Sequence, residues 1–291
     1  MPGFKTKVIR NVLRRKVAAW VNSIEDITVR DLTARHTIVS GGAIASMLLG
    51  EKPNDYDFYF RNYETAFAVA NYYAGILGPV AGRIIDVVGG DHKNILEETE
   101  MRVFTFIKSV GTAEEPSADT GERSAKARKD WCKKKFRPLF ISSNAVTLSD
   151  KVQLITRFHG SPEQILRNYD FAHCMCYYDA AVNKLVLPND ALEALLTKTL
   201  IYKGSLYPIA SVLRLRKFIA RGWRISAGQI MKMVYQMQLI DFDNNEMMMD
   251  QLLGVDATFM YAFINALKNA TDALRADLTY LCDLLDKVFG D

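Results

Sequence analysis

The stretch from His36 to Phe60 constrains the fold more than any other part of this sequence. A short apolar run, residues 36–39, leads into the glycine turn Ser40-Gly41-Gly42. Residues 43–49 then have helical spacing and end at a glycine, as helices often do. After a short loop, residues 55–60 form an aromatic-rich run that predicts a strand. The order is therefore strand, tight turn, helix and strand.

Asp55 and Asp57 point to one side of the second predicted strand, because strand side chains alternate between two faces. Two like charges a few ångströms apart repel each other, and a divalent cation relieves that repulsion. Magnesium suits the position, since one or two carboxylates and substrate phosphates commonly hold it. The glycines let the backbone approach a phosphate, and the N-terminus of the next helix offers free N–H groups. These are the parts needed to hold a nucleoside triphosphate.

Phosphoryl-type transfer with two metal ions needs a third carboxylate. Asp170 is the favoured candidate, because it opens the predicted strand 169–178 among hydrophobic neighbours, where an uncompensated charge is costly. Asp86 is the alternative and lies in a weaker strand pattern. The choice between the two acids stays open at this point.

The remaining chain divides into a mixed half and a helical half. In the first half, helices are predicted over residues 5–24, 63–77 and from 161, where Ser161 is the expected cap. Strands are predicted over 83–88, 101–110, 139–148, 152–158 and 184–187, with 89–91 as a turn. From residue 190 onwards the pattern is helical. We therefore predict an α+β fold, with a mixed-sheet catalytic domain over residues 1–188 and an all-α domain over 189–291.

A basic helix is predicted over residues 206–221, directly after the catalytic half. Arg214, Lys217 and Arg221 fall on one face of it. Such a face can grip a triphosphate tail or a nucleic-acid backbone, and we expect it to bind nucleotide. The alternative interpretation is a solvated helix face.

A second basic feature is the segment of about 111–137, which we expect to be a mobile loop. It has eight basic and two acidic residues between positions 121 and 137. Lys133, Lys134 and Lys135 lie between Trp131 and Phe136, and basic residues beside aromatic ones suit a single-stranded nucleic acid. The alternative interpretation is a solubilising loop.

Composition is that of an ordinary globular protein, with 49% apolar and 24% charged residues and a net charge of +4. No run of 18 apolar residues occurs, so we expect no membrane span. The four cysteines, which include Cys174 and Cys176, have no metal-binding spacing, and we expect free thiols without a disulfide-linked partner. His159 and His173 are interpreted as structural. We expect a cytoplasmic protein, in the host-cell cytoplasm if it is virus-encoded.

The segment SGGAIASMLLGEKPNDYDFYF resembles the DNA polymerase beta-type nucleotidyltransferase superfamily, which includes CCA-adding enzymes and poly(A) polymerases. The blocks SSNAVTLSDKVQLITRFHG and ILRNYDFAHCMCYYD resemble nucleotidyltransferases of phages and large viruses. The resemblance implies a nucleotidyltransferase-type mixed sheet, with Ser40, Gly41 and Gly42 on the triphosphate. It also implies that Asp55, Asp57 and Asp170 are catalytic and bind Mg²⁺ or Mn²⁺. The Arg-Arg-Asp motif common in CCA-adding enzymes is absent.

We therefore predict an enzyme that transfers a nucleotidyl group from an NTP such as ATP to a hydroxyl and releases pyrophosphate. An RNA 3′ end, on a tRNA or another RNA, is the favoured acceptor because of the basic segments. One alternative is a catalytically inactive relative that binds nucleic acid or forms part of a virion. Another is a toxin-like enzyme that modifies tRNA or protein.

Overall fold

The computed structural model describes residues 3–81, 84–96, 98–108, 131, 133–241 and 244–251, together with positions 271, 279, 280, 283 and 287. Most of the predicted mobile loop, residues 109–130 and 132, lies outside the described residues. Most of the chain after residue 251 also lies outside them. Among the described residues no helix is long and apolar enough to cross a membrane.

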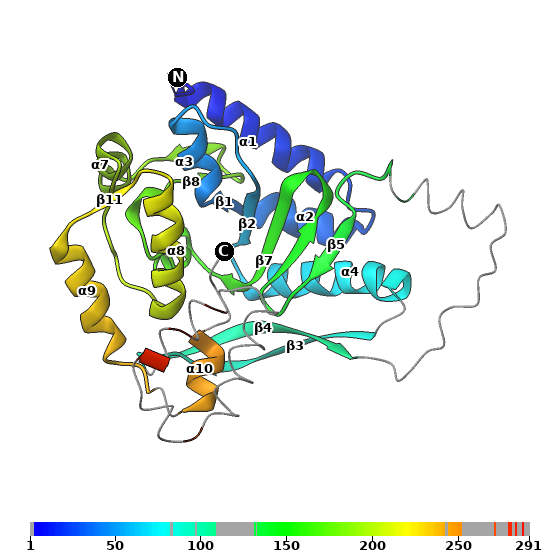
Figure 1. Ribbon diagram of the computed structural model, residues 1–291. Helices are drawn as coiled ribbons and strands as arrows, with labels where there is room; N and C mark the ends of the chain where they lie inside the picture. The colour runs from blue at the N-terminus through cyan, green and yellow to red at the C-terminus, as the bar shows by residue number, and fades with distance from the viewer. Residues whose placement is uncertain are drawn as a thin grey trace.

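Seven strands form one mixed sheet in the order β5-β6-β7-β2-β1-β8-β9 (Figure 1). They are β1 (Thr37–Ser40), β2 (Tyr56–Phe60), β5 (Pro138–Ile141), β6 (Ala145–Leu148), β7 (Val152–His159), β8 (Tyr177–Asp179) and β9 (Lys184–Val186). β2 pairs with β7 in parallel, and the other neighbouring pairs of this sheet are antiparallel. The predicted α+β class with a mixed sheet is confirmed.

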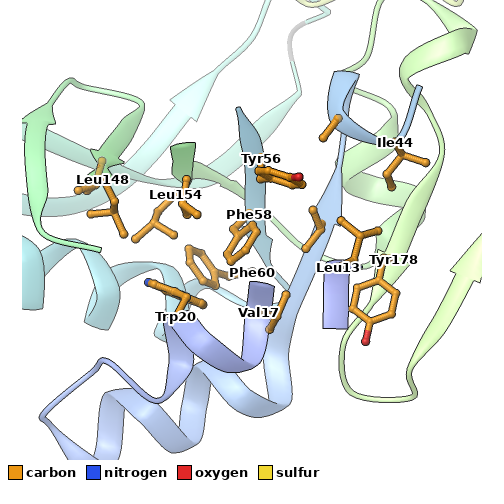
Figure 2. Packing of buried hydrophobic residues seen from close by; sticks show 14 of the residues in the cluster. Leu13, Val17, Trp20, Ile44, Tyr56, Phe58, Phe60, Leu148, Leu154 and Tyr178 are labelled. Atoms are coloured by element: carbon orange, nitrogen blue, oxygen red, sulfur yellow. The ribbon is translucent and has the colours of Figure 1, made fainter. Parts of the chain in front are cut away.

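The core lies between this sheet and the helices α1 (Thr6–Val21) and α4 (Tyr63–Ala81). Trp20 of α1 is fully buried and meets Phe58 edge to face, with ring centroids 5.2 Å apart. Its indole Nε1 donates a hydrogen bond to the Tyr73 hydroxyl of α4, at 2.9 Å. Figure 2 shows Trp20 and Val17 against Phe58 and Phe60. These helices therefore cover the face of β2 opposite to Asp57, as period-two alternation requires.

Three shorter helices, α2, α3 and α6, also belong to this half. Helix α2 (Ile27–His36) begins at Asp26, whose carboxylate accepts a hydrogen bond from the Val29 N–H. Helix α3 (Gly42–Leu48) connects β1 to β2. Helix α6 (Pro162–Leu166) begins with the predicted cap at Ser161, which forms a reciprocal capping box with Gln164.

The segment after residue 188 is largely helical where it is described. Its helices are α7 (Asn189–Thr197), α8 (Pro208–Ala220), α9 (Ala227–Met237) and α10 (Asn245–Gln251). It also contains two short strands, β10 (Thr199–Leu200) and β11 (Arg224–Ile225), which pair in parallel. Strands of two residues are too short for a periodic pattern, so the sequence did not predict them. Figure 1 shows α7, α8 and α9 together on the left, away from α4 and β5.

A separate hairpin forms from β3 (Ile84–Lys93) and β4 (Thr99–Lys108). The predicted turn at residues 89–91 is wrong, because Gly89 and Gly90 lie inside the ladder. Asn94 makes the turn instead, and its side-chain oxygen accepts hydrogen bonds from two backbone N–H groups further along the turn. Gly89 is needed for another reason, since the Tyr63 hydroxyl lies 1.7 Å from where its Cβ would be.

Two other predicted strands differ in extent. Residues 139–148 form two strands, because Ser142 turns the chain with side-chain hydrogen bonds. In the predicted strand 169–178 only the end is extended, in β8. Residues Ala172–Cys174 form a 3-10 turn, η2, and Phe171 makes an isolated bridge to Tyr202. Tertiary packing overrides a strand-like sequence here.

Candidate active site

The glycine turn lies directly against Asp57. Strand register pairs Ser40 with Asp57, so Gly41 leaves β1 beside the aspartate. Gly41 has φ +93°, a conformation that strongly favours glycine. A Cβ there would lie 2.7 Å from Asp57 Oδ2 and 3.2 Å from the Tyr169 hydroxyl. The turn therefore needs glycine both for its backbone conformation and for the space that the carboxylate occupies.

A cavity of about 770 Å³ opens at this turn and reaches across to α8. We call it the carboxylate cavity. The predicted site residues that line it are Gly41, Gly42, Asp55, Asp57, Asp170, Arg214 and Arg221. The cavity thus gathers residues from the glycine turn, from β2, from the segment before η2 and from α8. Residues more than 150 positions apart in sequence, such as Gly41 and Arg221, line the same cavity.

Asp57 is the most perturbed acid of the cavity. Burial raises its pKa from 3.8 to about 7, and the charge of Asp55 raises it further in the same direction. The ionised form is therefore strained by loss of solvent and by a like charge. A bound cation would compensate both the loss of solvent and the repulsion between the two carboxylates. The pair therefore fits the predicted Mg²⁺ or Mn²⁺. In this pair Asp55 is exposed and Asp57 is half-buried.

Asp170 lines the same cavity but has a protein partner. Its side chain is 6% exposed, and Arg214 Nε donates a hydrogen bond of 2.6 Å to its Oδ2. The described residues hold no group of three or more metal-ligating side chains. Asp55, Asp57 and Asp170 line one cavity, and the joint binding of a metal ion by the three carboxylates stays a prediction. Arg214, predicted to bind nucleotide, and Asp170, predicted to bind metal, form an ion pair with each other.

Helix α8 turns a mixed basic and aromatic face to the cavity. Arg214, Phe218 and Arg221 line it, at spacings of four and three residues. Lys217 is exposed and does not line the cavity. Helical spacing alone does not decide whether Lys217 or Phe218 faces the cavity together with Arg214 and Arg221. The packing of Phe218 against His173, with ring centroids 4.5 Å apart, determines which face is turned inward.

Four other predicted site residues lie outside the cavity. Ser40 is fully buried and donates its hydroxyl hydrogen to the Cys176 carbonyl, at 3.0 Å, so this side chain is held within the sheet. Lys133, Lys134 and Lys135 lie near α1 and α4, where Lys134 forms an exposed ion pair of 2.6 Å with Glu25. That location is on the helix-covered side of the sheet. The rival acid, Asp86, lies in the β3–β4 hairpin and does not line the cavity.

Cys174 and His173 line the cavity, and burial shifts the pKa of each toward its neutral form. Burial raises the pKa of the Cys174 thiol, and the charges of Asp170 and Asp57 raise it too. Burial lowers the pKa of His173 to about 4, so the imidazole is neutral at pH 7. His173 also packs against Trp223, with ring centroids 4.3 Å apart. The structural role of His173 stays a prediction, and its ring contacts with Phe218 and Trp223 are consistent with it. Cys174 and Cys176 are free thiols.

The sequence analysis did not identify the tyrosines of the site. Tyr59 shares a strand face with Asp57, and the Tyr169 hydroxyl donates a hydrogen bond of 3.0 Å to its hydroxyl. The period-two pattern that selected Asp55 and Asp57 also selects Tyr59, so a signal was present. Tyr169 carried no such signal, because it reaches the turn only through tertiary packing.

The fold and cavity define an α+β protein in which carboxylates and arginines gather at one end of a mixed sheet. Comparison with known families goes one step further. The chain belongs to the Gabija anti-defense 2 family, whose sequence model matches residues 11–198. No curated protein matches the chain significantly.

Solved structures of tRNA-processing nucleotidyltransferases are similar to this chain at low identity. A CCA-adding enzyme in complex with CTP is 12% identical with a TM-score of 0.42, and the alignment covers 100% of this chain and 63% of the enzyme. A tRNA nucleotidyltransferase with a primer tRNA and an ATP analogue is 14% identical with a TM-score of 0.37, over 87% and 57%. The Thermotoga maritima CCA-adding enzyme with tRNA is 12% identical with a TM-score of 0.38, over 94% and 62%. The chain thus spans about three fifths of these enzymes.

Proposed function

We propose that the protein is a metal-dependent nucleotidyltransferase that uses the carboxylate cavity to bind a nucleoside triphosphate. The observation that carries the proposal is the contact between the glycine turn and Asp57. A turn without side chains leaves its backbone open to a phosphate, and the acid that would hold the metal lies 2.7 Å from the missing Cβ. The cavity is also large enough for a nucleotide, at about 770 Å³.

We assign the side chains as follows. Asp55 and Asp57 hold a divalent cation, which neutralises charge on the phosphates of the bound nucleotide. Gly41 and Gly42 offer backbone to the triphosphate. Arg221 adds positive charge from α8, on the opposite side of the cavity. The nucleotide then lies between the proposed catalytic domain, residues 1–188, and the proposed helical domain, residues 189–291.

The reaction is displacement at the α-phosphorus. A hydroxyl oxygen of the acceptor forms a bond to that phosphorus, the bond to the β-phosphate oxygen breaks, and pyrophosphate leaves. A carboxylate takes the proton of the hydroxyl, and we assign this role to Asp170. In the present structure Arg214 occupies that carboxylate. Nucleotide binding offers Arg214 a phosphate as an alternative partner, which would leave Asp170 free to act.

An RNA 3′ end is the proposed acceptor, and a protein hydroxyl is the alternative. The name of the family describes anti-defense against Gabija, and we propose that nucleotidyl transfer is the means of that effect. The tRNA and nucleotide complexes named for the similar structures belong to those enzymes.

The decisive experiment incubates the purified chain with each radiolabelled NTP, with Mg²⁺, total RNA and lysate protein. We expect label on RNA, and its loss in Asp57→Ala and Asp170→Asn. Asp86→Asn is the matched control, because that acid lies outside the cavity, and it should retain labelling. Labelling that survives in Asp57→Ala refutes the site. Thermal stabilisation by MgATP without any labelling would favour the inactive nucleotide-binding relative instead.

A further inference from the structure

A second cavity of about 670 Å³ adjoins the carboxylate cavity. We call it the arginine cavity, after the five basic side chains among its described lining residues, which are Arg61, Arg102, Arg157, Arg167 and Lys203. The acids among these lining residues are Glu98 and Glu100. The carboxylate cavity has the opposite balance, with four acids and three basic residues among those described. The arginine cavity can therefore bind an anion directly, whereas the carboxylate cavity needs a cation to bind a phosphate.

Two of the arginines are buried and held in fixed orientations. Arg102 is 1% exposed, and its Nη1 donates a hydrogen bond of 2.8 Å to the Tyr207 hydroxyl. Arg157 is also 1% exposed, and its Nη2 donates a hydrogen bond of 2.8 Å to Asp250 Oδ1. Each guanidinium lies over an aromatic ring, Arg102 over Phe158 at 5.3 Å. Buried cations are costly unless they are compensated or used, and their Nε atoms have no hydrogen-bond partner among the described residues.

The acids that pair with the lining cations lie mostly behind them. Arg61 pairs with Asp179, Arg157 with Asp250, and neither acid lines the cavity. Arg167 is exposed at the mouth, and no hydrogen bond or ion pair of its side chain occurs among the described residues. Arg102 pairs with Glu100, which lines the cavity, and Lys203 pairs with Asp190. Among the described lining cations, Arg167 is therefore the one without a carboxylate partner.

The two cavities share part of their walls. Phe158 and Asn168 line both of them. Tyr207 lines the carboxylate cavity while its hydroxyl binds Arg102 of the arginine cavity. An anion in the arginine cavity would therefore lie beside a wall that also lines the carboxylate cavity.

We propose that the arginine cavity binds a backbone phosphate of the acceptor, so that the acceptor is a nucleic-acid strand whose 3′ hydroxyl reaches the carboxylate cavity. The inference rests on the proposed function and assigns a binding site to its proposed acceptor. Guanidinium groups bind phosphate through paired N–H donors, and they need no metal to do so. The lysines at positions 133–135 line neither cavity.

The test measures RNA binding apart from catalysis. Fluorescence anisotropy follows a fluorescein-labelled single-stranded RNA of roughly 12 nucleotides, in EDTA and without NTP. Arg167→Glu should weaken binding about tenfold and lower the slope of log Kd against log salt by about one. Arg167→Lys should retain most of the affinity. Arg15→Glu is the matched control, because Arg15 is exposed on α1, lines neither cavity and carries the same charge change.

The outcomes separate this inference from the proposed function. Asp57→Ala should bind RNA like the original chain, whatever the labelling experiment shows. Equal RNA affinity of Arg167→Glu and the original chain overturns the inference, as does loss of binding in Lys133→Glu alone. If the RNA does not bind but AMP or pyrophosphate does, and Arg167→Glu abolishes that binding, then the ligand is a small phosphate compound and the strand assignment is wrong.

Discussion

Replacing Gly41 with alanine tests how closely the glycine turn and the catalytic acid are coupled. Alanine at φ +93° costs roughly 1–2 kcal/mol in backbone strain. Its Cβ would also lie 2.7 Å from Asp57 Oδ2, and crowding of this kind typically costs about 1–3 kcal/mol. We expect the free energy of unfolding to fall by about 3 kcal/mol. Urea denaturation followed by tryptophan fluorescence measures that change.

Gly42→Ala is the matched control at the next position. Nothing lies within 4 Å of the Cβ that alanine would add there, and Gly42 is the first residue of α3. We expect unchanged stability, or a gain of up to about 1 kcal/mol from the lower entropy of the unfolded chain. For transfer activity, Gly41→Ala should lose more than its fraction unfolded explains, because Asp57 must move. Equal destabilisation by the two substitutions would refute the reasoning.

Three further predictions concern single side chains. The raised pKa of Asp57 means that its protonated form is favoured on folding, so metal-free stability falls as pH rises from about 4 to about 7. Thermal unfolding across that range should show the fall, and Asp57→Asn should flatten it. Tyr73→Phe leaves the buried Trp20 Nε1 without an acceptor and should cost about 1–3 kcal/mol in urea denaturation. Arg214→Met leaves Asp170 unpaired, so we expect lower stability in EDTA and partial recovery with Mg²⁺.

Each of these predictions has a result that contradicts it. A pH profile of Asp57→Asn parallel to that of the original chain would mean that another group titrates. Tyr72→Phe is the control for the tyrosine substitution, because its hydroxyl accepts only an exposed backbone hydrogen bond, and an equal loss there would remove the argument from burial. Unchanged stability of Arg214→Met would show that the ion pair with Asp170 is not formed in solution.

The central elements could be predicted because they depend on local geometry. Alternation along residues 55–60 placed Tyr56, Phe58 and Phe60 in the core and Asp57 on the other face, as the structure has them. The capping signal at Ser161 was read correctly for the same reason, since a capping box involves only neighbouring residues. The turn of the β3–β4 hairpin was misplaced, because glycine marks either a turn or a close approach, and Gly89 serves the second.

The sequence by itself determined the mixed α+β class, the strand carrying Asp57 directly after Asp55, and the glycine turn before it. Only the tertiary structure decided that Arg214 binds Asp170, that Phe218 and not Lys217 faces the carboxylate cavity, and that a second, arginine-lined cavity adjoins it. The physical reason is the distance along the sequence over which each interaction acts. Backbone periodicity and capping act over a few residues, whereas ion pairing and loss of solvent depend on which distant segments pack together.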